Sequence, residues 1–448
     1  ISASASPPRT AARMATSVYR IPAADIEAAA VFTHTSPVGV YRGAGRPEAN
    51  LLMERLMEKA ARQLGMDRIE MRRRNLVTPA DMPYTPLPGP GAYVYDSGDF
   101  GAALDRCLAA ADWEGFPGRR AASEAQGLLR GRAASNYIEY SGVGNERMEV
   151  RIDANGDALI LSGTHSHGQG HATAWAQIVS DRLGIPLARI RFIQGDTQTV
   201  SYGRGAYAAR SSLVGGCALV LAAQGIVDKA RRIAARLLKA DADEIEHERG
   251  LFRLRGTNRS VALDDIARAA FAMVLPEGET LGLEATGTWG ANPPAFPNGA
   301  QACEVEIDPQ TGQVRIDRFA CADDVGILIN PLICEGQVWG GLAQGLGQAL
   351  LEHLAYDAGG QLSAGSFMDY AMPRATDMPH LSAEWANIPS KTNPLGVKGV
   401  GETSVIATPA VILHAILDAL QDFGVEDIEL PATPARILDC IRGAGGTR

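Results

Sequence analysis

The sequence predicts an α+β protein in which two similar hairpin-plus-helix units pack together, with their glycine-rich loops at a shared edge. Residues 145–164 alternate like a strand, turn at an Asn-Gly pair and alternate again, which is a strong hairpin signal. Residues 302–324 repeat this pattern and share the motif E-V-x-I-D. An apolar helix is predicted after each hairpin, over 171–183 and 335–351. Such a repeat packs as an α+β pair, which brings the loops of both units together.

The remaining elements follow from helical spacing and from the positions of proline and glycine. Pro47 suits the first turn of a helix with leucines at helical spacing, and Gly65 suits its end. The predicted order is strand-like runs at 19–21 and 29–33, helices over 47–64, 67–76 and 100–111, a proline- and glycine-rich connection over 78–99, a long helix over 212–238, short strands and a proline-rich stretch within 239–300, and an apolar helix near 409–422 before a short final helix.

We divide the chain into three parts, 1–130, 131–300 and 301–448, of which the second and third each hold one repeat unit. The chain starts without a methionine and its first predicted strand begins almost at once, so we expect a fragment or a processed piece.

Composition excludes several classes of function. The chain has 448 residues, 46% of them hydrophobic and 21% charged, which is ordinary for a globular protein. A net charge of −9 gives no support for nucleic-acid binding. Six cysteines without a C-x-x-C motif argue against disulfides and against a cysteine metal site, so a cytoplasmic location is expected. We expect no membrane span, because no apolar run reaches the necessary length.

Four loops join glycine to amide, hydroxyl or guanidinium groups, and the first is GQG at residues 168–170. It directly precedes a predicted helix, where free N–H groups and the helix dipole favour an anion. The alternative is a zinc site formed by His165, His167 and His171. No acid or cysteine lies nearby to complete a set of zinc ligands.

The second loop, 202–216, also precedes a helix. Arg204 and Arg210 favour an anion cradle here, because guanidinium pairs well with phosphate. Ser211 and Ser212 could instead cap the helix, and in isolation a cap is the commoner use of such serines.

The third and fourth loops are also ambiguous when each is taken alone. Arg42 and Arg46 flank the small residues 43–45, which fits either a close approach to a ligand or a plain tight turn. Gln337 and Gln344 lie on an apolar, glycine-rich helix, either as donors to a ligand or as packing glutamines with partners.

One acid, Glu402, ends the glycine-rich stretch VKGVGE. The helix that follows is apolar almost all round, so we expect it and its start to be buried. Burial would make the carboxylate a stronger proton acceptor, as a general base requires, and Lys398 would offset part of that effect. The alternative is an exposed, inert acid. The residues alone thus predict a phosphate-bearing anionic cofactor cradled by loops, with one carboxylate base.

These motifs, in this order, resemble the molybdopterin-binding large subunit of the xanthine dehydrogenase, aldehyde oxidase and carbon monoxide dehydrogenase family. The resemblance runs from VFTHTSPVGVYRGAGRPEA through GQGHATAWAQI, GDTQTVSYGRGAYAARSS, NPLICEGQVWGGLAQGLG and VKGVGETSV to LPATPARI. It implies that Glu402 is the catalytic base, which takes a proton from a molybdenum-bound hydroxyl group. The cofactor-binding residues that it implies are Gln169, Gly170, His171, Ala209, Arg210, Ser211, Ser212, Gln337, Lys398, Gly399 and Gly401, and the loop beside the metal and substrate is Arg42, Gly43, Ala44 and Gly45.

The resemblance also implies cofactors and partners. The expected cofactor is molybdopterin with molybdenum, in the cytosine dinucleotide form, without a direct protein ligand to the metal. FAD and two [2Fe-2S] clusters are expected on partner chains, because this chain has no suitable cysteine set. The expected partners are an Fe-S subunit, a FAD subunit, a small-molecule substrate and the N-terminal half of the molybdopterin-binding subunit, as a separate chain or a missing segment.

The implied reaction is oxidation of an aldehyde or an N-heteroaromatic C–H group with oxygen from water. One alternative is a carbon monoxide dehydrogenase-type oxidase, but CO-oxidising members hold copper with a cysteine where this chain has Gly43. Xanthine-type members place a bulky aromatic residue where this chain has Ala44, which argues against a purine clamped in that way. The other alternative, a non-catalytic structural subunit or paralogue, is disfavoured by the intact Gln169, Gln337 and Glu402.

Overall fold

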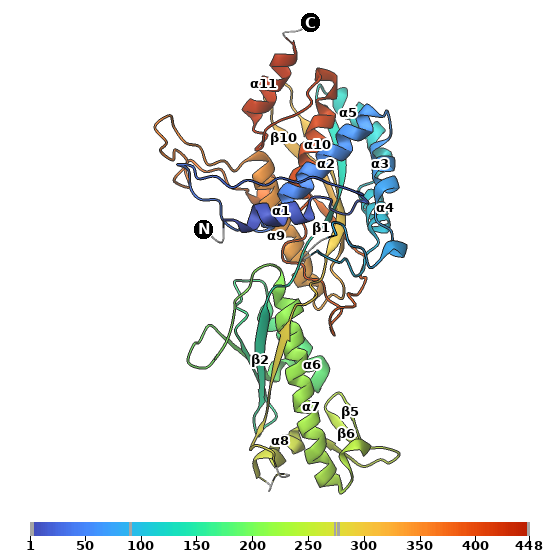
Figure 1. Ribbon diagram of the computed structural model, residues 1–448, viewed down its shortest axis with the longest axis vertical. Coiled ribbons are helices and arrows are strands. Elements are labelled where there is room, and N and C mark those ends of the chain that lie inside the picture. Colours follow the sequence, from blue (N-terminus) through green and yellow to red (C-terminus); the bar gives the residue numbers. More distant parts are fainter. Residues whose placement is uncertain (1–3, 89–91, 273–274, 276–277, 446–448) are drawn as a thin grey trace.

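The computed structural model describes residues 4–88, 92–272, 275 and 278–445, and within them the predicted α+β class is confirmed. Figure 1 shows two lobes stacked along the long axis, with α6, α7 and α8 in the lower lobe and the other labelled helices in the upper lobe. The helices are α1 (Ser6–Met14), α2 (Arg46–Gln63), α3 (Arg68–Asn75), α4 (Phe100–Ala110), α5 (Phe116–Glu124), α6 (His171–Leu183), α7 (Cys217–Leu238), α8 (Leu263–Ala272), α9 (Pro331–Leu350), α10 (Thr408–Ala419) and α11 (Pro434–Gly445).

Each repeat unit contributes its hairpin to a different four-stranded sheet. In the lower lobe the strand order is β4-β3-β2-β8, and in the upper lobe it is β1-β9-β10-β11. A third sheet has the order β5-β6-β7. The strands are β1 (Leu129–Ile138), β2 (Asn145–Ile152), β3 (Ala158–Ser162), β4 (Ile190–Gln194), β5 (Ile245–Glu248), β6 (Leu251–Leu254), β7 (Ser260–Ala262), β8 (Leu283–Gly290), β9 (Asn298–Ile307), β10 (Val314–Asp324) and β11 (Leu381–Trp385).

Both predicted hairpins are confirmed, since β2 pairs antiparallel with β3 and β9 pairs antiparallel with β10. The helix that follows the first hairpin has the predicted bounds, whereas α9 begins four residues earlier than predicted, at Pro331. Asn330 caps that earlier start, because its side chain accepts a hydrogen bond from the backbone N–H of Ile333.

The predictions for the start of the chain were wrong. Tyr19 makes a single bridge to Leu76 rather than a strand, and residues 29–33 form no strand. Residues 6–14, for which no helix was predicted, form α1 with proline in its first turn. The connection at 78–99 contains one short 3-10 turn over 79–81, and its residues 89–91 lie outside the described part.

Apolar helices cover the inner faces of both large sheets. All twelve residues of α10 are buried, as predicted, and α10 packs against β1 and β9. The long helix α7 packs against β8 and β2 and is preceded by a π-helical turn at residues 211–216. By length and composition, residues 211–238 are apolar enough to cross a membrane, but 67% of that apolar window is buried inside the protein. These residues are therefore part of the core.

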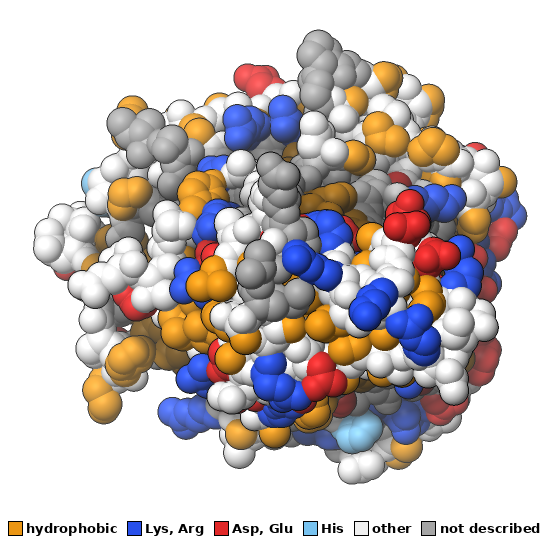
Figure 2. Space-filling view, turned by 90° about the horizontal axis from the view of Figure 1, so that it is seen from below, with side chains coloured by type: hydrophobic (Ala, Val, Ile, Leu, Met, Phe, Trp, Pro, Cys, Tyr) orange, Lys and Arg blue, Asp and Glu red, His pale blue; other side chains and the backbone are white. Residues whose placement is uncertain are grey.

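Charges of both signs are mixed on the lower end of the molecule. Figure 2 shows this end, with lysine and arginine side chains in separate groups among acidic and apolar ones.

Candidate functional site

Loops from both repeat units meet around a hollow of about 560 Å³. Its volume lies in the range of about 300–1,000 Å³ that is usual for small-molecule sites. Ten of the predicted site residues line it: Arg42, Gln169, His171, Ala209, Ser211, Ser212, Gln337, Gly399, Gly401 and Glu402. The remaining six, Gly43, Ala44, Gly45, Gly170, Arg210 and Lys398, are not among its lining residues. The sequence therefore identified segments that the fold brings together from distant parts of the chain.

The loop before α6 contributes Gln169 and His171 to the lining of this hollow. The side chain of Gln169 folds back on its own loop, where Nε2 donates to the carbonyl of His165 at 3.2 Å. His171 is buried, and its Nδ1 lies 3.2 Å from the carbonyl oxygen of Thr164. Burial lowers the pKa of His171 to about 4, so the ring is neutral at physiological pH. Within the described residues, no group of three His, Cys, Asp or Glu side chains is arranged to hold a metal.

The loop before α7 is strained and is supported from behind. Ala208 and Ala209 both have positive φ, at 51° and 47°, which non-glycine residues rarely adopt. The guanidinium of Arg210 is fully buried and pairs with Glu146 at 2.8 Å, so it holds the loop instead of facing the hollow. The alternative of a serine cap is wrong, because Arg210 occupies the cap position and no side chain there accepts a cap hydrogen bond.

Arg42 joins two of the other loops across the hollow. Its Nε donates to the carbonyl of Gly401 at 2.5 Å, and its Nη2 donates to the carbonyl of Gln337 at 2.9 Å. Gln344 acts as a packing glutamine, since its amide donates to the carbonyl of Arg42 at 3.0 Å. Arg42, the only lysine or arginine among the described residues that line this hollow, therefore also fixes its shape.

Glu402 is buried, as predicted, with 9% of its surface exposed. Its Oε2 accepts a hydrogen bond of 2.7 Å from Nη2 of Arg46, and its Oε1 accepts a longer one of 3.3 Å from the N–H of Gly43. Lys398, which was expected to act on Glu402, pairs instead with Asp324, whose carboxylate lies 2.5 Å from its ammonium. The cation beside Glu402 is thus Arg46, which has 4% of its side chain exposed.

Glycines allow the loops to pack closely around the hollow. A Cβ at Gly399 would lie 2.8 Å from the carbonyl oxygen of Ala209, and one at Gly170 would lie 2.7 Å from a methyl group of Ile333. Both glycines have positive φ, 89° and 78°. Larger residues at these positions would therefore push the loops apart.

Several residues of the site were not predicted. Trp175, Tyr207 and Ile333 supply apolar wall, and Cys334 lies beside them in the hollow. Burial raises the pKa of Cys334 to about 11, so its thiol stays protonated and supplies no thiolate. Glu139 is fully buried and contacts Arg46. The sequence gives one signal for it, which is an acid within the apolar stretch Tyr-Ile-Glu-Tyr at the end of a strand.

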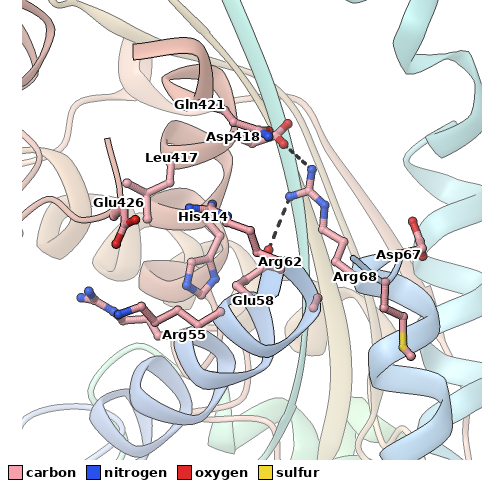
Figure 3. A pocket seen from close by; sticks show the side chains of 13 residues that line it. Arg55, Glu58, Arg62, Asp67, Arg68, His414, Leu417, Asp418, Gln421 and Glu426 are labelled. Carbon is pink, nitrogen blue, oxygen red and sulfur yellow. Dashed lines mark hydrogen bonds and ion pairs between the residues drawn. The ribbon is translucent and has the colours of Figure 1, made fainter. Parts of the chain in front are cut away.

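A second hollow, of about 280 Å³, lies between α2 and α10 and is shown in Figure 3. Arg68 bridges Glu58 and Asp418 across it. His414 points into the space between these helices, yet neither of its ring nitrogens has a hydrogen-bond partner. Burial lowers the pKa of His414 to about 4.

We expect His414→Leu to stabilise the protein, most strongly at acidic pH. A histidine with a lowered pKa in the folded state contributes stability above its unfolded pKa of 6.5, and this is lost as pH falls towards 4. The variant should gain about 1 kcal/mol at pH 7, because it removes unpaired buried nitrogens, and about 3 kcal/mol more near pH 4. Urea unfolding at both pH values checks this, and parallel pH curves for variant and parent would contradict it.

The comparisons with known proteins identify a family for this chain. Residues 106–379 and residues 1–76 each match a family described as a molybdopterin cofactor-binding domain. The chain is 36% identical to the nicotine 6-hydroxylase large subunit of Paenarthrobacter nicotinovorans, over 97% of this chain and 54% of that protein. It is 36% identical to the carbon monoxide dehydrogenase large chain of Hydrogenophaga pseudoflava, over 95% of this chain and 54% of that protein.

A solved structure gives the same result. Quinoline 2-oxidoreductase from Pseudomonas putida 86 superposes with a TM-score of 0.92 and 34% identity, over 98% of this chain and 57% of that chain. The chain thus spans about half the length of the relatives that it matches, 54% of each of the two named above.

Proposed function

This chain belongs to the family of proteins with molybdopterin cofactor-binding domains, and from that premise we propose that it is part of a molybdenum hydroxylase that oxidises an N-heteroaromatic or aldehyde C–H group with oxygen from water. The observation that carries the proposal is the convergence of ten predicted site residues on one hollow, in which Glu402 is the only carboxylate among the described lining residues. We propose the roles that the family resemblance implies for the ten residues that line the hollow and for the neighbouring glycines and alanine at 43–45 and 170. Arg210 and Lys398 instead hold their loops from behind, through Glu146 and Asp324.

The residues present fit a molybdenum-pterin cofactor. Gln169, Gln337 and the two serines at 211 and 212 offer neutral donors, and Arg42 adds one cation for an anionic group. The glycines at 170 and 399 leave room for close backbone approach. Cys334, the one cysteine among the described lining residues, stays a protonated thiol, which fits a metal held by its organic cofactor. When bound, such a cofactor supplies a two-electron acceptor and an oxygen atom derived from water.

The chain's own residues would then position the substrate and move one proton. Glu402 lies at the wall of the hollow, where its carboxylate accepts the proton that the reaction releases. Arg42 keeps the loop of Gly401 against α9, so the distance from this carboxylate to the substrate stays fixed. Trp175 and Ile333 keep water from one wall of the site.

The N-heteroaromatic class is favoured as substrate. The names of two relatives specify nicotine and quinoline, and both compounds contain an N-heteroaromatic ring. The apolar wall around Trp175 suits a flat ring, because aromatic surfaces pack well against each other.

Carbon monoxide oxidation is the second candidate, because one relative of equal identity bears that name. The geometry at Gly43 counts against it. That residue has a φ of 101°, and a Cβ would lie 2.5 Å from the ring of Pro47, so a copper-holding cysteine does not fit there. Copper analysis together with a CO-oxidation assay distinguishes the two candidates.

We further propose an Fe-S subunit with two [2Fe-2S] clusters, a FAD subunit and the remaining half of the large subunit as partners. The names "large subunit" and "large chain" of the relatives, and their greater length, support this. The cytosine dinucleotide form of the cofactor and the three-part division at 130 and 300 stay predictions. A cytoplasmic location is supported by six cysteines that are all free.

The test is purification of the assembled complex through a tag on this chain, followed by metal and pterin analysis. We expect about one molybdenum per chain and turnover of at least one compound in a panel of pyridines, quinolines and aldehydes, with an artificial electron acceptor. A fully assembled complex without molybdenum would refute the proposal. If only aldehydes are turned over, the assignment as a molybdenum hydroxylase stands and the preference for N-heteroaromatic substrates is refuted.

A further inference from the structure

We propose that Arg46 and Glu139 are positioning residues for Glu402, and that one shared guanidinium holds the carboxylate of Glu402 at the wall of the site. The three residues are called the buried triad below. The inference rests on the proposed function, because it assigns a task to the neighbours of the proposed base.

The contacts within the buried triad are short, and its side chains are almost fully shielded from solvent. Nη2 of Arg46 lies 2.7 Å from Oε2 of Glu402 and 2.7 Å from Oε1 of Glu139, and Nε donates to Oε2 of Glu139 at 3.0 Å. The exposed fractions of the side chains are 4% for Arg46, 0% for Glu139 and 11% for Glu402. Only Glu402 lines the hollow, so the other two residues lie behind it.

Three separate segments supply the buried triad. Local backbone contacts restrict the positions of Arg46 and Glu139. Arg46 is the first residue of α2, directly after the left-handed Gly45, where a Cβ would clash with the backbone of Pro7. Glu139 follows β1, and its N–H donates to the carbonyl of Pro297 at 2.7 Å. The guanidinium therefore has little freedom to turn away from the two carboxylates.

Two carboxylates share the guanidinium of Arg46. The charge of Glu139 therefore decides how strongly Arg46 can stabilise the carboxylate of Glu402. Burial raises the pKa of Glu139 to about 8, with Arg46 acting in the opposite direction. At neutral pH Glu139 is thus mainly protonated, and the guanidinium of Arg46 is then available to the carboxylate of Glu402. Above pH 8 the ionised Glu139 competes for the same guanidinium.

The other charged or titratable groups facing the buried triad are few among the described residues. Arg42 faces Glu402 from the side of the hollow. Tyr93 faces Arg46, and Tyr140 lies beside both Arg46 and Glu139 with Arg13 near it. Burial raises the pKa of Tyr140, so it stays neutral through the range in which Glu139 titrates.

A matched control exists in the same protein. Arg72 is also buried between two glutamates, with Nη2 at 2.6 Å from Glu54 and 2.8 Å from Glu58. None of these three residues lines the proposed site. Glu54→Gln therefore repeats the change Glu139→Gln in an equivalent arrangement without a proposed role.

The experiment follows Glu402 in the assembled complex by isotope-edited infrared titration, with its band assigned by its loss in Glu402→Gln. The same variants are assayed for the pH dependence of kcat/KM on a substrate from the panel. In the parent we expect a step near pH 8 in the environment of the Glu402 carboxylate and in kcat/KM. Glu139→Gln should abolish this step, and Glu54→Gln should keep it.

Arg46→Met should move the protonation of Glu402 upward by about 1–3 pH units, since an opposite charge is lost. Arg46→Lys should restore the pH at which Glu402 is protonated, because it restores the positive charge. Its kcat should stay lowered, because an ammonium lacks the planar, multi-donor geometry with which a guanidinium holds two carboxylates. The proposal is overturned if Glu402 titrates at the same pH in Arg46→Met as in the parent. If Arg46→Met does not fold, persistence of the step near pH 8 in Glu139→Gln overturns it.

The infrared titration needs no turnover, so it separates the two ideas. Full activity of Glu402→Gln at normal molybdenum content would refute the proposed base. The infrared titration of the parent and of the Arg46 variants would still report whether Arg46 controls Glu402. Loss of activity in Glu402→Gln, with Glu139→Gln and Arg46→Lys behaving like the Glu54→Gln control, would refute only the inference.

Discussion

Glu402→Gln should lower the turnover of the assembled complex by about 10²–10⁴-fold, while its molybdenum content stays unchanged. Glutamine has nearly the same shape, and its carbonyl oxygen can still accept the hydrogen bond from Arg46. The amide cannot take up a proton, so only the step that needs a base is lost. Steady-state kinetics and metal analysis on the same preparation check this result.

The control for this prediction is Glu335→Gln. Glu335 is an exposed acid on α9, between the site residues Cys334 and Gln337, and it does not line the hollow. Its substitution removes the same charge close to the site and should leave turnover within about twofold of the parent. Full turnover of Glu402→Gln would refute the base, and loss of molybdenum would show that Glu402 is needed to bind the cofactor.

The parts of the fold that depend on local pattern could be predicted. The Asn-Gly turn and the alternation on both sides of it were sufficient for the hairpin of β2 and β3. The pairing of β1 with β9 joins residues that are 160 to 178 positions apart, from Ile138 with Asn298 to Leu129 with Ile307. No local signal gives such a distant partner. The run at 19–21 failed for the same reason, because strand propensity depends on the neighbours that a segment finds.

The site was predictable as a set of loops but not as a set of side-chain directions. Each loop had a plausible structural use when taken alone, and only the resemblance joined them. Arg210 was a reasonable anion ligand by type, yet Glu146, 64 residues earlier, takes its guanidinium. Lys398 lies four residues before Glu402, yet its partner is Asp324 on β10. Spacing in the sequence cannot show which of two buried acids a cation will meet.

Lys398→Met should lower the free energy of unfolding by about 3–5 kcal/mol, because it leaves Asp324 as an uncompensated buried charge. Both side chains are almost fully buried, at 0% and 1% exposure, and methionine fills nearly the same volume. The backbone N–H of Lys398 still donates to Val325 at 2.8 Å, so the effect comes from the side chain. Urea unfolding at pH 7 measures it.

The double variant Lys398→Met with Asp324→Asn should recover at least half of that loss. An asparagine oxygen can keep the hydrogen bonds from the N–H groups of Gly326 and Ile388. Its new amide needs an acceptor, and Oδ1 of Asn298, which has no partner in the parent, belongs to a side chain 3.3 Å from Asp324. Recovery would show that the cost of Lys398→Met is an unpaired charge. No recovery would mean that the loss comes from the other contact of the ammonium, its hydrogen bond to the carbonyl of Ser97 at 3.4 Å.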